Sequence, residues 1–160
     1  MQFHLIDKIV DCQPGKHLTA MKNLTLGEEY LGDHFPGFPV MPGVLMLQTV
    51  VEAASWLLRV TEDYRFSIIA LREVKNVKYG SFMEPGRTMK VHVEVQELGA
   101  SEAVFKGRGE CDGASTVSGR IVLARYNLSD RSPGMKDLDR DIIDGLKRRH
   151  RILTIGGMKG

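Results

Sequence analysis

One stretch of the sequence, residues 44–59, constrains the fold more than any other. It reads VLMLQTVVEAASWLLR, is not interrupted by proline or glycine, and spreads its apolar side chains around most of a helical circumference. A helix of that kind is expected to be buried on nearly every side. Other elements of the domain must therefore wrap around it.

The segment before this helix is predicted to be a rigid loop. Residues 31–43, LGDHFPGFPVMPG, contain three prolines and three glycines, which obstruct both helix formation and strand pairing. Such a loop can hold the side chain of His34 in a fixed position.

Strand-like segments surround the helix in the sequence. The segments HLIDKIVD and HLTAMKNLTL, which flank Pro14-Gly15, are typical of a hairpin. After the helix come FSIIALREVKNVKY, RTMKVHVEVQEL, EAVFKGRGECD and STVSGRIVLARY, of which MKVHVEV alternates as a half-buried antiparallel strand does. We expect an α+β domain in which three to four meandering strands wrap one helix, leaving apolar surface for a second copy to cover.

Composition and charge divide the chain into two parts. With 160 residues, 42% of them hydrophobic, one domain is expected, over residues 1–128. Residues 129–160 form a basic C-terminal extension with 8 Lys and Arg against 5 Asp and Glu, and the helical spacing of Leu138, Ile142, Leu146 and Leu153 predicts an amphipathic helix. This helix either packs on the domain or binds an acidic partner or a membrane surface. The near-neutral main part argues against nucleic-acid binding.

Location and cofactors are predicted from what the sequence lacks. Cys12 and Cys111 form no CxxC motif, and we expect reduced, structural thiols in a cytoplasmic protein. The beginning of the chain does not resemble a signal peptide, and no run of apolar residues reaches the ~18 that a transmembrane segment needs. The spacing of the histidines offers no metal site, and no dinucleotide-binding or phosphate-binding motif is present, so neither a metal nor a cofactor is expected.

His34 either has a structural role or supplies acid–base chemistry together with a carbonyl-binding group at Gly43. Gly43 stands at the start of the predicted helix, where unpaired N–H groups and the helix dipole can polarise a carbonyl oxygen. A neutral imidazole at His34 is a suitable base for a proton next to that carbonyl. Further along the helix, Gln48, Glu52, Ser55 and Arg59 form one polar stripe, which either belongs to the site or faces solvent.

The run HFPGFPVMPGVL closely resembles the signature of the hot-dog-fold 3-hydroxyacyl-acyl-carrier-protein dehydratases, the FabZ/FabA type of fatty-acid synthesis. The resemblance extends from Phe3 to about Asn127 and includes LIDKIVDCQPGK, SFMEPGRTMKVHVEV and FKGRGECDG. It implies a curved antiparallel sheet wrapped around a long central helix, and dimers that assemble further into trimers of dimers. It also implies that His34 is the catalytic histidine, that the Gly43 amide binds the thioester carbonyl, and that His34 faces helix residues of the other subunit across an apolar acyl tunnel.

The chain departs from this family at the catalytic acid. The acid of the family falls fourteen residues after the histidine, where this chain has Gln48, and the usual glutamine four residues later is Glu52. An amide can hold a hydroxyl group but cannot protonate it. Because helical side chains lean toward the N-terminus, we expect Glu52 to take over the acid role beside Gln48, with burial in the tunnel favouring its protonated form.

The resemblance predicts a dehydratase that removes water from a 3-hydroxyacyl thioester and leaves a trans-2-enoyl thioester. The carrier of the acyl group is acyl-carrier protein or coenzyme A. Two alternatives stay open: an acyl-thioester-binding paralogue with weak or no dehydratase activity, and a hot-dog thioesterase in which Glu52 activates water.

Overall fold

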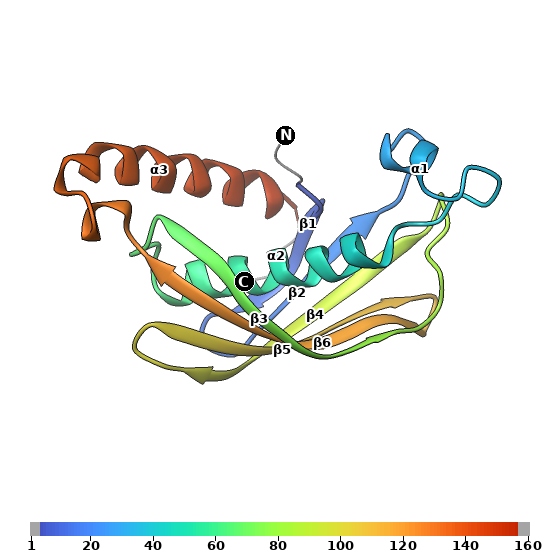
Figure 1. Ribbon diagram of the computed structural model, residues 1–160, viewed down its shortest axis with the longest axis horizontal. Helices are drawn as coiled ribbons and strands as arrows, with labels where there is room; N and C mark the ends of the chain where they lie inside the picture. The colour runs from blue at the N-terminus through green and yellow to red at the C-terminus, as the bar shows by residue number, and fades with distance from the viewer. Residues whose placement is uncertain (1–3, 157–160) are drawn as a thin grey trace.

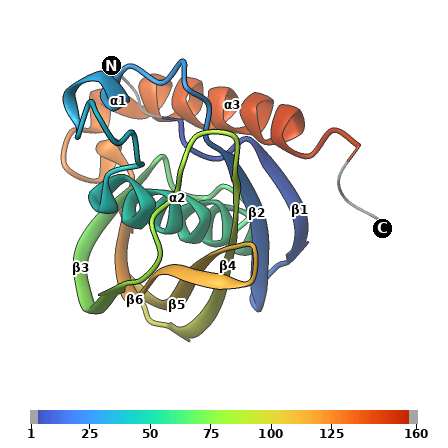
Figure 2. The same ribbon diagram turned by 90° about the vertical axis from the view of Figure 1, so that its right-hand side faces the viewer.

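A six-stranded antiparallel sheet curves around one long helix, α2 (Gly43–Thr61), in the computed structural model, which describes residues 4–156 (Figures 1 and 2). The strands are β1 (Lys8–Gln13), β2 (His17–Asn23), β3 (Ile68–Tyr79), β4 (Thr88–Leu98), β5 (Glu102–Cys111) and β6 (Ala114–Tyr126). Their order in the sheet is β1-β2-β4-β5-β6-β3. This is the α+β architecture expected from the sequence, a hot-dog fold in which the sheet wraps the central helix.

The strand order differs from a simple meander in one respect. β4, β5 and β6 are consecutive neighbours, as predicted, but β3 pairs with β6 at the far edge of the sheet instead of with β4. The open side of β4 is taken by β2, so the N-terminal hairpin forms the end of the sheet opposite β3, with β1 at its edge. The hydrophobic pattern of β3 could not reveal this, because alternation along a strand does not specify its neighbour.

Helix α2 lies in the concave face of the sheet and supplies much of the core. Its buried residues are Met46, Thr49, Val50, Val51, Ala53, Ala54, Trp56, Leu57 and Leu58. β5 approaches the helix closely because Gly107 has no side chain: a Cβ there would lie 2.2 Å from Cγ1 of Val50. By length and composition α2 could also cross a membrane, but half of its most apolar window is buried in this fold.

The helix is not buried along its whole length, contrary to the expectation from its composition. Near its N-terminus Val44 is 69% exposed and Gln48 is also exposed. Only toward the C-terminal half is the outer side of α2 covered, by the N-terminal segment and by α3 (Lys136–Leu153) (Figure 2). The exposed part of the helix is therefore the part that follows the proline-rich loop.

Helix α3 is attached to the rest of the protein through a buried carboxylate. It follows two short 3-10 helices, η1 (Leu128–Asp130) and η2 (Pro133–Met135). Asp139 accepts hydrogen bonds from the Ser67 hydroxyl and, at 2.9 Å each, from the backbone N–H groups of Leu128 and Ser129. The carboxylate thus links α3 to η1 and to the segment before β3.

Candidate functional site

The proline-rich loop is held in shape by its own backbone and by a contact with a second loop. One turn of helix, α1 (Tyr30–Asp33), enters it, so the prediction of an entirely helix-free segment from residue 31 is wrong at its start. The first proline is at position 36 and does not prevent that turn. At the other end the N–H of Met41 donates to the carbonyl of Met83 at 2.9 Å, and both of these side chains are buried.

His34 ends α1 and lies at a strained point of the backbone. The next residue, Phe35, has a φ of +48°, in the left-handed region that non-glycine residues seldom adopt and that is often found at functional sites. The imidazole of His34 is partly exposed, and its centroid lies 4.5 Å from that of the Phe35 ring. Within residues 4–156 this imidazole has no hydrogen-bond partner, so both ring nitrogens are left for a ligand.

The start of α2 presents free N–H groups, as the sequence predicts. Helix α2 begins at Gly43. The carbonyl oxygen of Pro42 accepts hydrogen bonds from the N–H groups of Leu45 and Met46, at 2.9 and 3.1 Å. No side chain caps the helix. The N–H groups of Gly43 and Val44 therefore have no partner in the described part of the chain and can bind a ligand oxygen.

Tyr79 explains why residue 43 is a glycine. A Cβ at position 43 would lie only 3.0 Å from Cε1 of Tyr79, at the end of β3. The phenol ring is thus packed directly against the helix start. Sequence reasoning missed Tyr79, since an aromatic residue at the end of a strand carries no signal about the helix that it contacts.

The structure separates the two polar residues that follow on α2. Gln48 is exposed, whereas Glu52 is partly buried against the N-terminal segment. Oε2 of Glu52 accepts hydrogen bonds from the backbone N–H groups of Leu5 and Ile6, with N···O distances of 2.7 and 3.3 Å. Its other oxygen, Oε1, makes no hydrogen bond to a described residue, so one carboxylate oxygen is left for a ligand.

The four predicted site residues follow one another from the loop into α2. His34 belongs to the loop at the N-terminal end of α2, Gly43 begins the helix, and Gln48 and Glu52 follow about one and a half and two and a half turns later (Figure 1). No hydrogen bond joins any two of these side chains within the described chain. A single protomer therefore presents the predicted groups without assembling them around one point.

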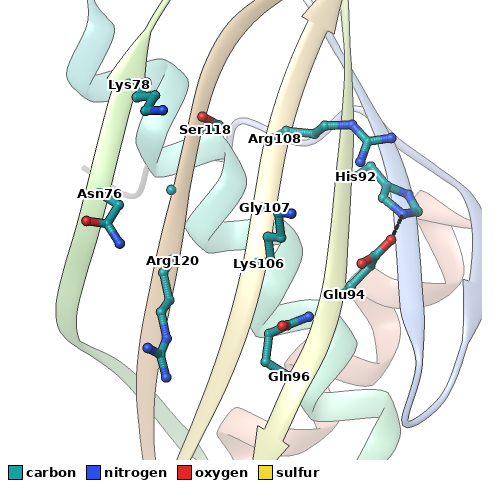
Figure 3. A pocket seen from close by; sticks show the side chains of 11 residues that line it. Asn76, Lys78, His92, Glu94, Gln96, Lys106, Gly107, Arg108, Ser118 and Arg120 are labelled. Atoms are coloured by element: carbon teal, nitrogen blue, oxygen red, sulfur yellow. Dashed lines mark hydrogen bonds and ion pairs between the residues drawn. The ribbon is translucent and has the colours of Figure 1, made fainter.

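A hollow of about 600 Å³ lies away from these residues, on the outer face of the sheet. Figure 3 shows its polar and basic lining, which includes His92, Glu94, Lys106, Arg108 and Arg120. These side chains alternate with core residues along β4, β5 and β6, the pattern of a solvated outer sheet face. The hollow contains none of the predicted site residues, and we place the candidate site at the loop and helix start instead.

The remaining expectations concern thiols and metals. Cys12 and Cys111 are both free, and burial, with a smaller contribution from Asp11, raises the pKa of Cys12 to about 11. A thiol with such a raised pKa is poorly nucleophilic, consistent with a structural role. In the described residues no three His, Cys, Asp or Glu side chains are grouped as metal ligands.

The fold and the signature loop define the class of protein, and comparisons give the family. Residues 1–122 match the model of the FabA-like domain, and the chain belongs to this family. It is 30% identical over 132 residues to the 3-hydroxyacyl-acyl-carrier-protein dehydratase FabZ of Janthinobacterium sp. (strain Marseille), covering 81% of this chain and 85% of that protein. The FabZ of Thiobacillus denitrificans is 32% identical over 123 residues, covering 75% and 85%.

Solved structures with low sequence identity share the fold. The dehydratase heterocomplex ApeI:P from Xenorhabdus doucetiae matches with a TM-score of 0.67 at 14% identity, covering 83% of this chain and 90% of that one. The smu.793 protein from Streptococcus mutans, solved with acetyl coenzyme A, matches with a TM-score of 0.59 at 12% identity, covering 79% and 92%. At these identities the comparison supports the hot-dog fold alone.

Proposed function

We propose that this protein is a 3-hydroxyacyl-thioester dehydratase of fatty-acid synthesis, which removes water to give a trans-2-enoyl thioester. The observation that carries the proposal is the helix start at Gly43, directly after the loop that holds His34. Among residues 4–156 neither the first N–H groups of the helix nor the His34 imidazole has a hydrogen-bond partner. Membership of the FabA-like family and the FabZ relatives support it. The acyl group would be carried by acyl-carrier protein or by coenzyme A, in the cytoplasm.

The chemistry follows from the groups present. His34 removes the proton from C2 of the acyl group, and the developing negative charge moves onto the thioester oxygen, which the Gly43 N–H stabilises. The electron pair then forms the C2–C3 double bond as the hydroxyl group leaves C3. That hydroxyl needs a proton, which Glu52 would donate from Oε1 while Gln48 holds the leaving oxygen by a hydrogen bond.

The proposal includes a homodimer, because one protomer does not bring these groups together. Five large apolar residues are 49 to 69% exposed at this end of the molecule: Phe35, Phe38, Val44, Tyr79 and Phe82. Exposed apolar clusters next to a free sheet edge, here the edge of β3, are typical of surfaces that a second copy covers. Such a dimer would bring His34 of one subunit to α2 of the other, and trimers of dimers would be the next level of assembly.

One observation favours a second candidate, an acyl-thioester-binding protein with little or no dehydratase activity. The N–H groups of Leu5 and Ile6 hold one oxygen of Glu52, and the position of the family acid carries the amide of Gln48. A protein without a working proton donor would keep the thioester site and lose the elimination. The two candidates differ in turnover and agree in ligand binding.

The deciding experiment is an assay with a 3-hydroxyacyl thioester that follows both the conjugated enoyl product and free thiol. For a relocated acid, the wild type forms the enoyl product, Glu52→Gln lowers kcat/KM by about 10²- to 10⁴-fold, and Gln48→Glu changes it little. If only Gln48→Glu forms the enoyl product, the wild type is an acyl-thioester-binding protein. If the wild type releases free thiol, it is a thioesterase. Unchanged activity in His34→Ala would refute the site as a whole.

A further inference from the structure

A pocket of about 280 Å³ lies between α2 and α3, and Glu52 is the one group of the proposed mechanism that reaches it. Its walls are Glu52, Ser55, Trp56 and Arg59 of α2, Leu146 and Arg149 of α3, and His4 of the N-terminal segment. Trp56 is almost fully buried, and its ring lies 5.8 Å from that of His150 on α3. The C-terminal extension therefore builds one side of this pocket.

Arg149 occupies an unusual place on α3. Its neighbours Lys147 and Arg148 are exposed, as the polar side of an amphipathic helix should be. Arg149 instead lies on the side that carries Leu146 and the buried Leu153, three and four residues away. Its Nε is buried and has no hydrogen-bond partner in the structure. A guanidinium on a packed helix face normally has a carboxylate or carbonyl partner.

Arg59 repeats this arrangement on the opposite wall. Its Nη1 is buried without a hydrogen-bond partner, and its guanidinium lies 5.8 Å from the centroid of the Trp56 ring. Burial lowers the pKa of Arg59 to about 10, although Tyr64 and Glu52 oppose that shift. Neither Arg59 nor Arg149 forms an ion pair with a carboxylate of residues 4–156.

Glu52, the one carboxylate among the described residues of the pocket, compensates only part of this positive charge. Its Oε2 is occupied by the N–H groups of Leu5 and Ile6, which hold it to the N-terminal segment. The pocket thus combines two cations with one carboxylate, and every nitrogen of the two guanidinium groups is a hydrogen-bond donor. Guanidinium groups have no acceptor capacity, so a matching ligand must accept hydrogen bonds and carry negative charge.

We propose that the pocket between α2 and α3 binds a small oxyanion, the carboxylate of an organic acid or a phosphate group, between Arg59 and Arg149. A planar guanidinium group can donate paired hydrogen bonds to two oxygens of a carboxylate or of a phosphate group. Trp56 and Leu146 supply an apolar wall for a short hydrocarbon portion. The proposed ligands, Arg59 and Arg149, have no catalytic role, although Glu52 lines the same pocket, so binding is measured separately from dehydratase activity.

Calorimetric titration of the full chain with butyrate and with inorganic phosphate, at constant ionic strength, tests this site. We expect saturable binding of at least one anion, with a Kd on the order of 1 mM. Arg149→Gln should weaken it by about tenfold or more, whereas Arg148→Gln removes the same charge from the exposed neighbouring position and should leave it unchanged. If Arg149→Gln does not fold, Arg149→Lys replaces it in the test. This variant keeps the charge without the planar guanidinium group, and we expect it to bind the anion more weakly than the wild type.

The two ligands distinguish the source of the anion. Binding of butyrate alone identifies a carboxylate site, binding of phosphate alone a phosphate site, and binding of both a general oxyanion site. No saturable binding of either anion to the wild type overturns the proposal. Equal losses in Arg148→Gln and Arg149→Gln also overturn it, since they would reflect only the overall charge of α3.

Discussion

The carboxylate of Glu52 fixes the beginning of the chain through Leu5, whose N–H donates to Oε2 at 2.7 Å. Ile6 donates to the same oxygen, and the side chains of Leu5 and Ile6 are both buried in the core. This residue therefore has a structural role in addition to the catalytic one proposed for it. Substitutions at position 52 must separate the two roles.

Glu52→Ala should destabilise the fold by about 1.5–3 kcal/mol, because two buried N–H groups lose a charged acceptor. Glu52→Gln keeps an acceptor oxygen and should cost less. Chemical denaturation measures both, and amide exchange at Leu5 and Ile6 shows whether the loss is local. If Glu52→Gln is folded and keeps full dehydratase activity, Glu52 is only structural.

Mixed dimers should recover activity that each parent lacks. If His34 of one subunit acts with Glu52 of the other, a heterodimer of His34→Ala and Glu52→Gln subunits contains one intact site of two. Random reassociation makes half of the dimers mixed, so roughly a quarter of wild-type activity is expected. The test is to refold the two variants together and measure the dehydration rate. The control is an equimolar mixture of the two variants after each has been refolded separately. If no activity is recovered, His34 and Glu52 of different subunits do not act together in one site.

Gly43→Ala should impair activity far more than stability. The new methyl group would meet the Tyr79 ring, which is 51% exposed and can move aside, so we expect a stability loss of less than about 1 kcal/mol. The part of this contact that the ring does not relieve should shift the helix start by a fraction of an ångström. Such a shift should lower kcat/KM by about tenfold or more. Adding Tyr79→Ala removes the obstruction and should restore activity; a double variant that stays inactive would show that the methyl group itself blocks the substrate.

Gly107→Ala should be strongly destabilising, in contrast to the previous substitution. Its Cβ would lie 2.2 Å from Cγ1 of Val50 in the core, where neither side can move freely. Overpacking of this kind costs about 1–3 kcal/mol or more in the free energy of unfolding. Thermal or urea denaturation should show partial rescue by Val50→Ala in the double variant. Gly134→Ala, which meets no atom within 4 Å, is the matched control and should change stability little.

The attachment of α3 should weaken in acid. Burial alone would raise the pKa of Asp139, but hydrogen bonds from Ser67, Ser129 and Leu128 outweigh it and lower that pKa from 3.8 to about 2. Because the folded pKa lies below the unfolded one, the stabilisation is complete above about pH 4 and is lost as the pH falls toward 2. Fluorescence of Trp56, the only tryptophan, reports the contact with α3. Asp139→Asn should remove this acid-dependent step; an unchanged profile would assign it to another group.

Local patterns in the sequence predicted the architecture and the segment that carries the candidate site. The apolar stretch after Gly43 predicted the central helix, the alternating segments predicted the strands, and the loop LGDHFPGFPVMPG predicted a rigid support for His34. The helix and the strands are confirmed because hydrophobic periodicity is a local property of the chain, whereas the loop as a support for His34 stays a prediction. The meander was wrong for β3 alone, since which strand lies next to which depends on the path of the whole chain.

The surroundings of each site residue depend on contacts that the folded chain makes. The contact of Gly43 with Tyr79, the N–H groups of Leu5 and Ile6 on Glu52, and the inward placement of Arg149 all join segments far apart in the sequence. Such contacts arise when the sheet curves around α2 and α3 closes over it (Figure 2). A polar stripe on a helix shows which residues share a face, whereas hydrogen bonding and burial depend on what the fold brings against that face.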